Sequence, residues 1–563
     1  MYHLMLPNTK WEYQVKIVGI CGTGGIGKTT VAKAVFNKIF DQFESRCFLN
    51  VKEVSDRQGI IYLQQQLLNN LLMEDDLKIC HVDYGINMIK ERLCHKKVLV
   101  VLDDVDSLKE LENLVGASDW YGLESKIIIT TRNERLLVEN KVDHAIYRVD
   151  LLNEDESFQL FSCHAFTKNN SEDNYLKISW RVIHYAQGLP LALEVLGTLL
   201  YKKNIEEWEI NLDKLERIPN RKIQDVLRLS FDGLDDMDQK NIFLDIACFF
   251  NGWFEEYVMD LLESCGFYPR IEIPVLIERS LLTITDDRIL SMHNVVQEMG
   301  RAIVHEESPD PGKRSRLWSF KDINKATEAI RGIMLNMPRG HLSEELLVNA
   351  DVFAKMKKLR LLKLSGPVRL CGQLTYLSNE LRYLVWNDYP LGFLPSNFHP
   401  QNLVQLQLPR SPIKQISTAI SSSNKLKLLC LRDCPYLKET PDLSSLPCLK
   451  DLDVTECVNL VKDHLSSGVH SKLVCVQLNE CIKLENFPRS IELKNLEYFS
   501  LSGCVKLENF PEIQGDMVRL KYLRLSNTGI YGLPSSIEHL NGIERLDLTR
   551  CQKLKNVPDN IFL

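Results

Sequence analysis

Residues 16–30 read KIVGICGTGGIGKTT, and this stretch decides the fold of the first part of the chain. It begins with a short apolar run, continues into a glycine-rich turn and ends on a Lys-Thr-Thr triplet. The pattern G-x-x-x-x-G-K-[ST] between a strand and a helix is typical of loops that cradle phosphate groups. The residues predicted to hold the phosphates are Gly22, Gly24, Gly25, Gly27, Lys28, Thr29 and Thr30.

The residue types explain the chemistry expected of this loop. Glycines let backbone N–H groups close around phosphate oxygens, and the following helix turns its positive N-terminus toward them. Lys28 is expected to reach the β- and γ-phosphates, and the Thr29 hydroxyl to ligate Mg²⁺.

An acid at the end of a buried strand is expected to complete the site. Residues 97–104 read KVLVVLDD and supply two. We predict that Asp103 contacts Mg²⁺ and that Asp104 polarises a water. Another apolar run ends at Arg132, where a cation could sense a γ-phosphate because positive charge stabilises a transferring phosphoryl group.

The rest of the first 150 residues fits a parallel sheet covered by helices. Apolar runs at 47–51, 98–102 and 126–130 alternate with segments of helical periodicity such as 29–40. Strands buried on both faces have this continuous apolar pattern. We predict a P-loop nucleotide-binding domain at 1–150.

The strand signal fades between about residues 150 and 325. Residues 155–166 and 189–201 have helical periodicity, and a two-stranded wing is plausible at 281–292. We predict a helical domain at 151–218 and a winged-helix domain at 219–325.

An internal L-x-x-L-x-L repeat fills the remainder, predicted as a leucine-rich-repeat solenoid at 326–563. Its steps of 22 to 24 residues lie within the leucine-rich-repeat range. Each unit should add one short strand to a parallel stack. The first positions are Leu359, Leu381, Leu403, Leu426, Leu449, Leu473, Leu496, Leu520 and Ile543. Structural cysteines are expected just after the strands, at Cys434, Cys457, Cys481, Cys504 and Cys551.

Composition narrows the class of protein. The 563 residues suggest three or four folded units, and a net charge of −7 argues against a dedicated nucleic-acid binder. No window of 18 uncharged apolar residues is present, so no membrane span is expected. We predict no signal peptide, a reducing compartment and therefore no disulfides among the 16 cysteines.

The motifs occur in an order that resembles a known family. GTGGIGKTT, KKVLVVLDDVD, SKIIITTRN, GLPLALEVLG (188–197), FLDIACFF (243–250) and MHNVVQEMGR (292–301) precede the repeats. The chain resembles plant intracellular immune receptors of the nucleotide-binding, leucine-rich-repeat (NLR) class. Asp106, which closes LDDVD, and FLDIACFF favour the branch that carries an N-terminal Toll/interleukin-1 receptor (TIR) domain.

The resemblance implies an ADP/ATP switch with Mg²⁺, located in the cytoplasm, with the nucleus as a second location. By similarity, Arg132 would sense the γ-phosphate, Pro190 would pack near the adenine, and His293 would touch the β-phosphate of ADP. The repeats would hold a closed form and sense a pathogen effector or a guarded host protein. Exchange of ADP for ATP would open the module and let it oligomerise.

The chain departs from the family pattern in two ways. The Met-His-Asp motif ends in Asn294, which removes a negative charge and should shift the balance toward the open form. The first strand begins near residue 16, so we expect no TIR domain and assign no NAD-cleaving activity. The repeats stop at Leu563 without a polar capping unit, as expected of an incomplete array.

Two other functions stay open. A P-loop ATPase is expected to be slow at most, whereas a TIR-less scaffold or adaptor pairing with TIR-bearing receptors, or a resistance-gene fragment, fits the same residues. For recognition of a protein, the central strand positions predicted to be exposed are Lys363, Val385, Gln407, Cys430, Asp453, Gln477, Ser500, Arg524 and Asp547.

Overall fold

The computed structural model describes residues 15–74, 77–139, 145–166, 173–215, 220–336, 346–366, 368–416, 420, 423–465 and 472–558. The chain divides into two compact units. The first contains residues 1–256 and 268–302, and the second contains residues 257–267 and 303–563. The first 14 residues, which bear on the expected lack of a signal peptide, lie outside the described residues, as does the predicted domain boundary at 218/219.

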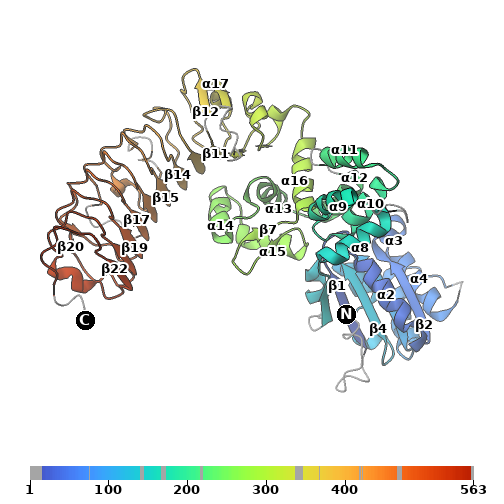
Figure 1. Cartoon of the computed structure of the whole chain (residues 1–563). Coiled ribbons are helices and arrows are strands. Elements are labelled where there is room, and N and C mark those ends of the chain that lie inside the picture. Colours follow the sequence, from blue (N-terminus) through green and yellow to red (C-terminus); the bar gives the residue numbers. More distant parts are fainter. Residues whose placement is uncertain are drawn as a thin grey trace. The chain divides into compact units, whose positions relative to one another are not determined.

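A five-stranded parallel sheet forms the centre of the nucleotide-binding part (Figure 1). Its strand order is β2-β3-β4-β1-β5, and every pairing is parallel. The predicted P-loop fold class is confirmed. The strands are β1 (Lys16–Cys21), β2 (Ser45–Asn50), β3 (Val98–Val105), β4 (Lys126–Thr131) and β5 (Ile146–Arg148).

Helices cover both faces of this sheet. On one face, α2 (Lys28–Ile39) packs its buried side chains against β1, β3 and β4. On the other, buried leucines of α4 (Ile60–Leu72) and α5 (Val82–Leu93) form a second core with α6 (Leu108–Leu114). Both faces of β3 are therefore buried, which explains its continuous apolar sequence.

Two details of the sheet differ from the sequence prediction. Strand β2 lies two residues earlier than expected at its start, and the chain turns into α3 (Val51–Gln58) because the Asn50 side chain accepts a hydrogen bond from Glu53 N–H. Strand β5 was not predicted. It has only three residues and is partly exposed, so it lacks the continuous apolar run of the inner strands.

Helices dominate from residue 154 to residue 306, as predicted. The predicted wing is a short antiparallel pair, β6 (Thr283–Ile284) with β7 (Leu290–Ser291). The helices are α7 (Glu134–Glu139) at the end of the sheet, then α8 (Glu154–Ala165), α9 (Asp173–Ala186), α10 (Pro190–Leu200), α11 (Ile205–Leu215), α12 (Arg221–Asp232), α13 (Met237–Asp245), α14 (Glu255–Ser264), α15 (Pro269–Glu278) and α16 (Asn294–Glu306).

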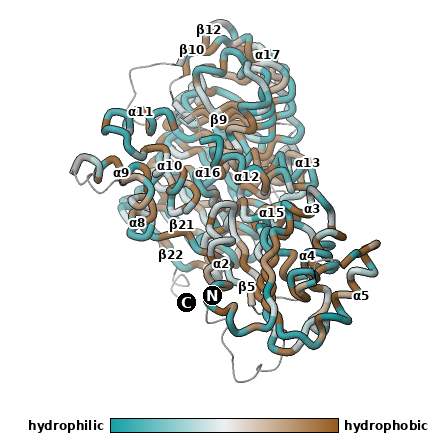
Figure 2. Tube along the Cα trace, turned by 90° about the vertical axis from the view of Figure 1, so that its right-hand side faces the viewer, coloured by the Kyte–Doolittle hydropathy of each residue, from teal (hydrophilic) through white to brown (hydrophobic). Residues whose placement is uncertain are grey.

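Several of these helices, including α11, α12 and α16, are amphipathic. In α11, hydrophilic and hydrophobic residues share one helix (Figure 2), and the buried ones include Trp208 and Leu212. Within the described parts of the chain, no helix combines the length and the apolar character needed to cross a bilayer.

The second unit contains an eleven-stranded parallel sheet in the order β8-β9-β11-β13-β14-β15-β16-β17-β19-β21-β22. Each predicted repeat supplies one strand two residues after its first leucine position, which confirms the solenoid. These strands are β11 (Leu361–Ser365), β13 (Tyr383–Trp386), β14 (Gln405–Gln407), β15 (Leu428–Cys430), β16 (Asp451–Asp453), β17 (Cys475–Gln477), β19 (Tyr498–Ser500), β21 (Tyr522–Arg524) and β22 (Arg545–Asp547).

The sheet also contains two strands that precede the counted repeats. Strands β8 (Arg316–Leu317) and β9 (Gly332–Asn336) extend it in the same parallel sense. They were not predicted. Strand β8 lacks the L-x-x-L-x-L spacing, and β9 follows that spacing with isoleucine at the first two positions, Ile330 and Ile333, 29 residues before Leu359. Smaller parallel pairs join β10 (Leu346–Asn349) to β12 (Val368–Cys371) and β18 (Ser490–Ile491) to β20 (Glu512–Ile513).

The predicted cysteine positions form a hydrogen-bonded ladder between repeats. Each Sγ–H donates to a backbone carbonyl of the preceding repeat, for example Cys457 to Leu431 at 3.0 Å and Cys481 to Val454 at 3.2 Å. Cys434, Cys504 and Cys551 make the equivalent bond. The structural role predicted for these thiols is confirmed.

Candidate functional site

The glycine-rich loop joins the end of β1 to the start of α2. Gly22, Gly25 and Gly27 have φ angles of 148°, 80° and 98°, which side-chain-bearing residues rarely adopt. Gly27 directly precedes the first turn of α2, whose N–H groups point into the loop. The backbone is thus shaped as an anion cradle at a helix N-terminus.

Lys28 lies inside this cradle. Its Nζ donates hydrogen bonds to the Gly22 carbonyl at 2.8 Å and the Thr23 carbonyl at 3.0 Å, and the residue is 7% exposed. Burial, followed by the nearby positive charge of Arg132, lowers the pKa of Lys28 to about 8. A bound phosphate would replace the two carbonyls with a full negative charge.

Thr29 and Asp103, the predicted Mg²⁺ ligands, face each other. The Thr29 hydroxyl donates to Asp103 Oδ1 at 2.9 Å, and Thr130 Oγ1 holds the same oxygen at 2.7 Å. Asp103 is buried at the end of β3. Hydroxyl and carboxylate oxygens side by side are the donors that Mg²⁺ prefers, so the residues present fit that ion.

The two residues predicted to be catalytic are paired with one another. Arg132 donates through Nε and Nη2 to Asp104 Oδ1 and Oδ2 at 3.1 and 3.3 Å. Its remaining nitrogen, Nη1, donates to the backbone carbonyl of Val226 in α12 at 2.7 Å. Asp104 sits in a bulge of β3 with φ 56°, and its role in polarising water stays a prediction.

Three known domain families match the chain in the order that the fold requires. The NB-ARC domain matches residues 6–171, and the winged-helix domain of Roq1-like disease resistance proteins matches residues 236–308. The leucine-rich repeats of RPS4B-like disease resistance proteins match residues 492–563. The chain belongs to the plant NLR disease resistance proteins, in their TIR-type branch.

Individual relatives agree with this assignment. The chain is 41% identical to disease resistance protein RUN1 of Vitis rotundifolia over 81% of this chain and 36% of that protein. It is 36% identical to TMV resistance protein N of Nicotiana glutinosa over 97% and 48% of the two chains. The chain therefore spans between a third and a half of these relatives. Among solved structures, the Walker-type ATPase PABY2304 of Pyrococcus abyssi gives a TM-score of 0.36 at 15% identity, over 51% of this chain and 91% of that one.

The NLR motif that contains Pro190 lies beside the phosphate loop. Pro190 is the first residue of α10, and the next residue, Leu191, donates its N–H to the Gly25 carbonyl at 3.1 Å. A side chain at Gly25 would collide with Leu191, because an added Cβ would lie 2.7 Å from the Leu191 Cβ. The contact of Pro190 with adenine stays a prediction.

His293 lies against the turn that precedes Pro190. Its Nε2 donates to the Gln187 carbonyl at 3.2 Å, and its Nδ1 accepts from Val295 N–H at 3.3 Å. Burial lowers the pKa of His293, and the hydrogen bond to the Gln187 carbonyl partly offsets this effect. Asn294 donates its backbone N–H to Gln187 Oε1 at 3.4 Å. The predicted contact of His293 with the β-phosphate is not tested by these bonds.

Other contacts at the site were missed by the sequence analysis. Thr23 Oγ1 donates to the Ser280 carbonyl at 2.9 Å, and Arg279 Nη1 lies 3.0 Å from Asp106 Oδ1. Thr23 is a variable position of the loop motif, and nothing in the pattern after α15 marks Arg279 or Ser280. Only Asp106 had been singled out, as a marker of the TIR-type branch.

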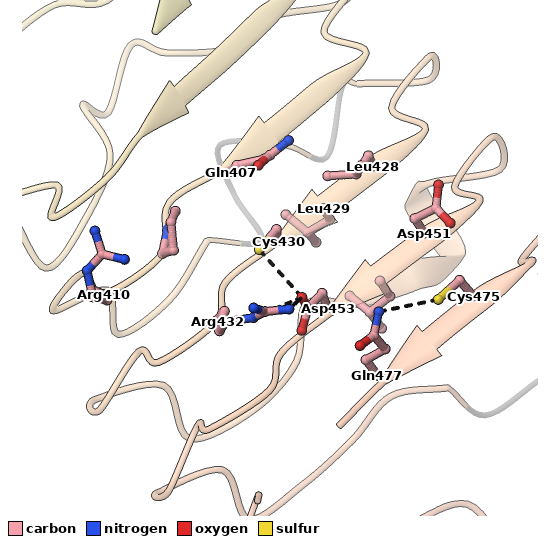
Figure 3. Close-up of a pocket in the computed structure, with 12 residues that line it drawn as sticks. Gln407, Arg410, Leu428, Leu429, Cys430, Arg432, Asp451, Asp453, Cys475 and Gln477 are labelled. Carbon is pink, nitrogen blue, oxygen red and sulfur yellow. Dashed lines mark hydrogen bonds and ion pairs between the residues drawn. The ribbon is translucent and has the colours of Figure 1, made fainter. Parts of the chain in front are cut away.

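The repeat face of this NLR carries a hollow of about 450 Å³ (Figure 3). Strands β14 to β17 line it with Gln407, Cys430, Asp453 and Gln477, all predicted to be exposed on this face. Arg432 pairs with Asp453 at 2.7 Å across one side. Two other predicted positions, Val385 and Ser500, are instead buried. Val385 is short and lies in register between Lys363 and Gln407, and the Ser500 hydroxyl bonds Asn479.

The lowered pKa of Lys28 predicts that nucleotide binding depends on pH. Phosphates bind the charged ammonium, so binding must take up a proton wherever free Lys28 is neutral, that is, above pH 8. We expect the ADP affinity to fall by about tenfold per pH unit above pH 8. Stability of the empty protein should rise over the same range, because unfolded Lys28 has the higher pKa and binds more protons.

Calorimetric titration of ADP between pH 7.5 and 9.5 measures this effect. Lys28→Arg is the matched control, since a guanidinium stays charged throughout. If ADP affinity fell with pH equally steeply in the wild-type protein and in Lys28→Arg, the pH dependence would belong to another group.

Proposed function

We propose that this chain is a nucleotide-dependent switch of plant immunity, held closed by ADP and opened when ATP replaces it. The observation that carries the proposal is the position of Arg132. One guanidinium ties the acid end of β3, through Asp104, to the Val226 carbonyl of α12. A γ-phosphate beside Gly24 would attract the same guanidinium, since an added Cβ at Gly24 would lie 3.2 Å from both Arg132 Nη1 and the Val226 oxygen.

The nucleotide would be held by the loop residues in separate roles. Backbone N–H groups from Gly22 to Lys28 would bind phosphate oxygens, and Lys28 would neutralise them. Thr29 and Asp103 would hold Mg²⁺, which supplies charge neutralisation at the phosphates. A slow ATPase activity is compatible with Asp104 held by Arg132, because a paired carboxylate is poorly available to a water.

The repeats would bias this equilibrium by binding a protein on the face that carries the hollow. A pathogen effector or a guarded host protein is the expected ligand, and a second copy or a TIR-bearing receptor is the expected partner of the open form. A ligand shifts the balance only by its differential affinity, and a swing from 1:99 to 99:1 needs roughly 5.5 kcal/mol.

Nucleotide exchange followed by hydrogen exchange tests the switch. The purified chain is loaded with ADP or with ATPγS and Mg²⁺, and amide exchange is measured in α12 and in residues 276–284. We expect faster exchange in both segments with ATPγS, as Arg132 leaves Val226. Arg132→Lys keeps the charge but cannot bridge Asp104 and the Val226 carbonyl in the same way. In this variant the exchange rates of the ADP and ATPγS states should differ less than in the wild-type protein. Identical protection in the two wild-type states would reject the switch.

Asn294→Asp is expected to slow ADP release. Asn294 is the first residue of α16, where a negative charge interacts favourably with the helix dipole by about 0.3 to 1 kcal/mol. The charge would brace α16 against the turn at Gln187, which corresponds to a two- to fivefold slower ADP dissociation. Displacement of a fluorescent ADP measures the rate. Asn294→Ser, which introduces a polar residue without charge, is the control. An unchanged ADP dissociation rate in Asn294→Asp would contradict a role for the charge at this position.

A further inference from the structure

Asp106 lies between two cations that come from different parts of the first unit. Lys52 Nζ of α3 lies 2.9 Å from Asp106 Oδ2, and Arg279 Nη1, directly after α15, lies 3.0 Å from Oδ1. Lys52 belongs to the nucleotide-binding part, as Asp106 does. Arg279 belongs to the winged-helix segment, so only this second pair joins the two parts.

Arg279 is well shielded from solvent. Its side chain is 13% exposed, against 22% for Lys52 and 32% for Asp106. Gly233, at the end of α12, leaves space for the guanidinium, because an added Cβ would lie 2.9 Å from Nη1. A shielded guanidinium that loses its carboxylate keeps an unpaired charge, and this makes the pair sensitive to either partner.

The residue after Arg279 contacts the phosphate loop itself. Ser280 has φ 55°, a left-handed conformation more usual for glycine at a helix end, and its carbonyl accepts the Thr23 hydroxyl bond. Arg279 and Ser280 therefore contact two different segments that border the predicted nucleotide site. Arg279 holds the segment that follows Asp103 and Asp104, and Ser280 holds the loop predicted to surround the phosphates.

We propose that the ion pair between Asp106 and Arg279, here called the clasp, holds the end of α15 against the segment that follows β3 and sets the rate of ADP release. The proposal rests on the switch function proposed above. Both residues are positioning residues, since neither is placed against the nucleotide. Lys52 orients the Asp106 carboxylate but is not part of the clasp.

A double-mutant cycle on the full chain tests the clasp. Dissociation of fluorescent ADP is measured for the wild-type protein, Asp106→Asn, Arg279→Gln and the double variant. We expect each single variant to release ADP at least about tenfold faster, and the double variant to be no faster than the quicker single one. ATPγS dissociation should change little in any variant, because the clasp is open in that state. A general loss of structure would affect both nucleotides.

Lys52→Gln is the matched control, because it removes the other cation from the same carboxylate. We expect its ADP release to stay within about twofold of wild type, and exchange at residues 276–284 to quicken only in the clasp variants. Multiplicative effects in the double variant, or an equal effect of Lys52→Gln, would overturn the clasp. If Asp106→Asn does not fold, the ADP dissociation rates of Arg279→Lys and Arg279→Gln are compared instead. The clasp predicts slower release from Arg279→Lys, which keeps the positive charge. A wild-type chain that binds no ADP would instead reject the switch function.

Discussion

Replacing Lys28 with alanine is expected to leave the purified chain without bound nucleotide. The ammonium lies in the cradle, bonded to the Gly22 and Thr23 carbonyls, where it would meet the phosphates as the charged donor of the loop. A hydrogen bond to a charged group contributes about 3 kcal/mol at most, and a Lys that serves two phosphates makes more than one. We expect a loss of affinity of at least a hundredfold. Denaturation followed by chromatography of the released nucleotide measures the content, with about one ADP per wild-type chain expected.

Lys33→Ala provides the control for this experiment. Lys33 lies in the same helix, α2, but it is exposed, and its ammonium lies over the ring of Phe48 in β2. It should retain ADP at the wild-type level. Mainly ATP in the wild-type protein would mean that Asn294 has tipped the balance toward the open form. An empty but folded wild-type protein would leave a repeat scaffold with an inactive phosphate loop.

Leu452→Ala should loosen the middle of the repeat array. Leu452 is 1% exposed and lies in register between Leu429 of β15 and Val476 of β17. Removal of a buried leucine side chain costs about 2 to 5 kcal/mol, because the cavity is only partly refilled. We expect a local destabilisation of about 3 kcal/mol in β15 to β17. Native-state hydrogen exchange is the appropriate measurement, because a chain of two units has no single unfolding free energy.

The same substitution at Leu546 is a matched control within the array. Leu546 occupies the equivalent position in β22 and pairs in register with Leu523, but it is only partly buried. We expect its replacement to cost less than half as much. Equal costs at the two positions would contradict nearest-neighbour stacking as the source of stability.

Most of the fold could be predicted because its sequence periods are strong. The repeat spacing placed the nine repeat strands, β11, β13 to β17, β19, β21 and β22, and the apolar runs placed the inner strands of the nucleotide-binding sheet. Strands β5 and β8 were not predicted because they have only three and two residues and no continuous apolar run, and β9 was not predicted because isoleucines replace the leucines of the repeat. Local pattern is weak where pairing is decided by a neighbouring strand.

The site could be predicted only where short sequence motifs contain its residues. Thr29 and Asp103, 74 residues apart, meet as expected because carboxyl ends of parallel strands share one edge. The link from Arg132 to Val226 could not be found in the same way, because its acceptor is a backbone carbonyl, which any residue provides. Arg279 likewise belongs to no motif that would have paired it with Asp106.

The cysteine ladder makes transient separation of neighbouring repeats measurable by thiol labelling. Each buried thiol donates a hydrogen bond to a carbonyl of the preceding repeat, as Cys457 does to Leu431 and Cys481 to Val454. An alkylating reagent can reach such a sulfur only while two neighbouring repeats stand apart. The labelling rates of successive thiols would therefore show how often each pair of neighbouring repeats separates, and at which end of the solenoid separation is most frequent.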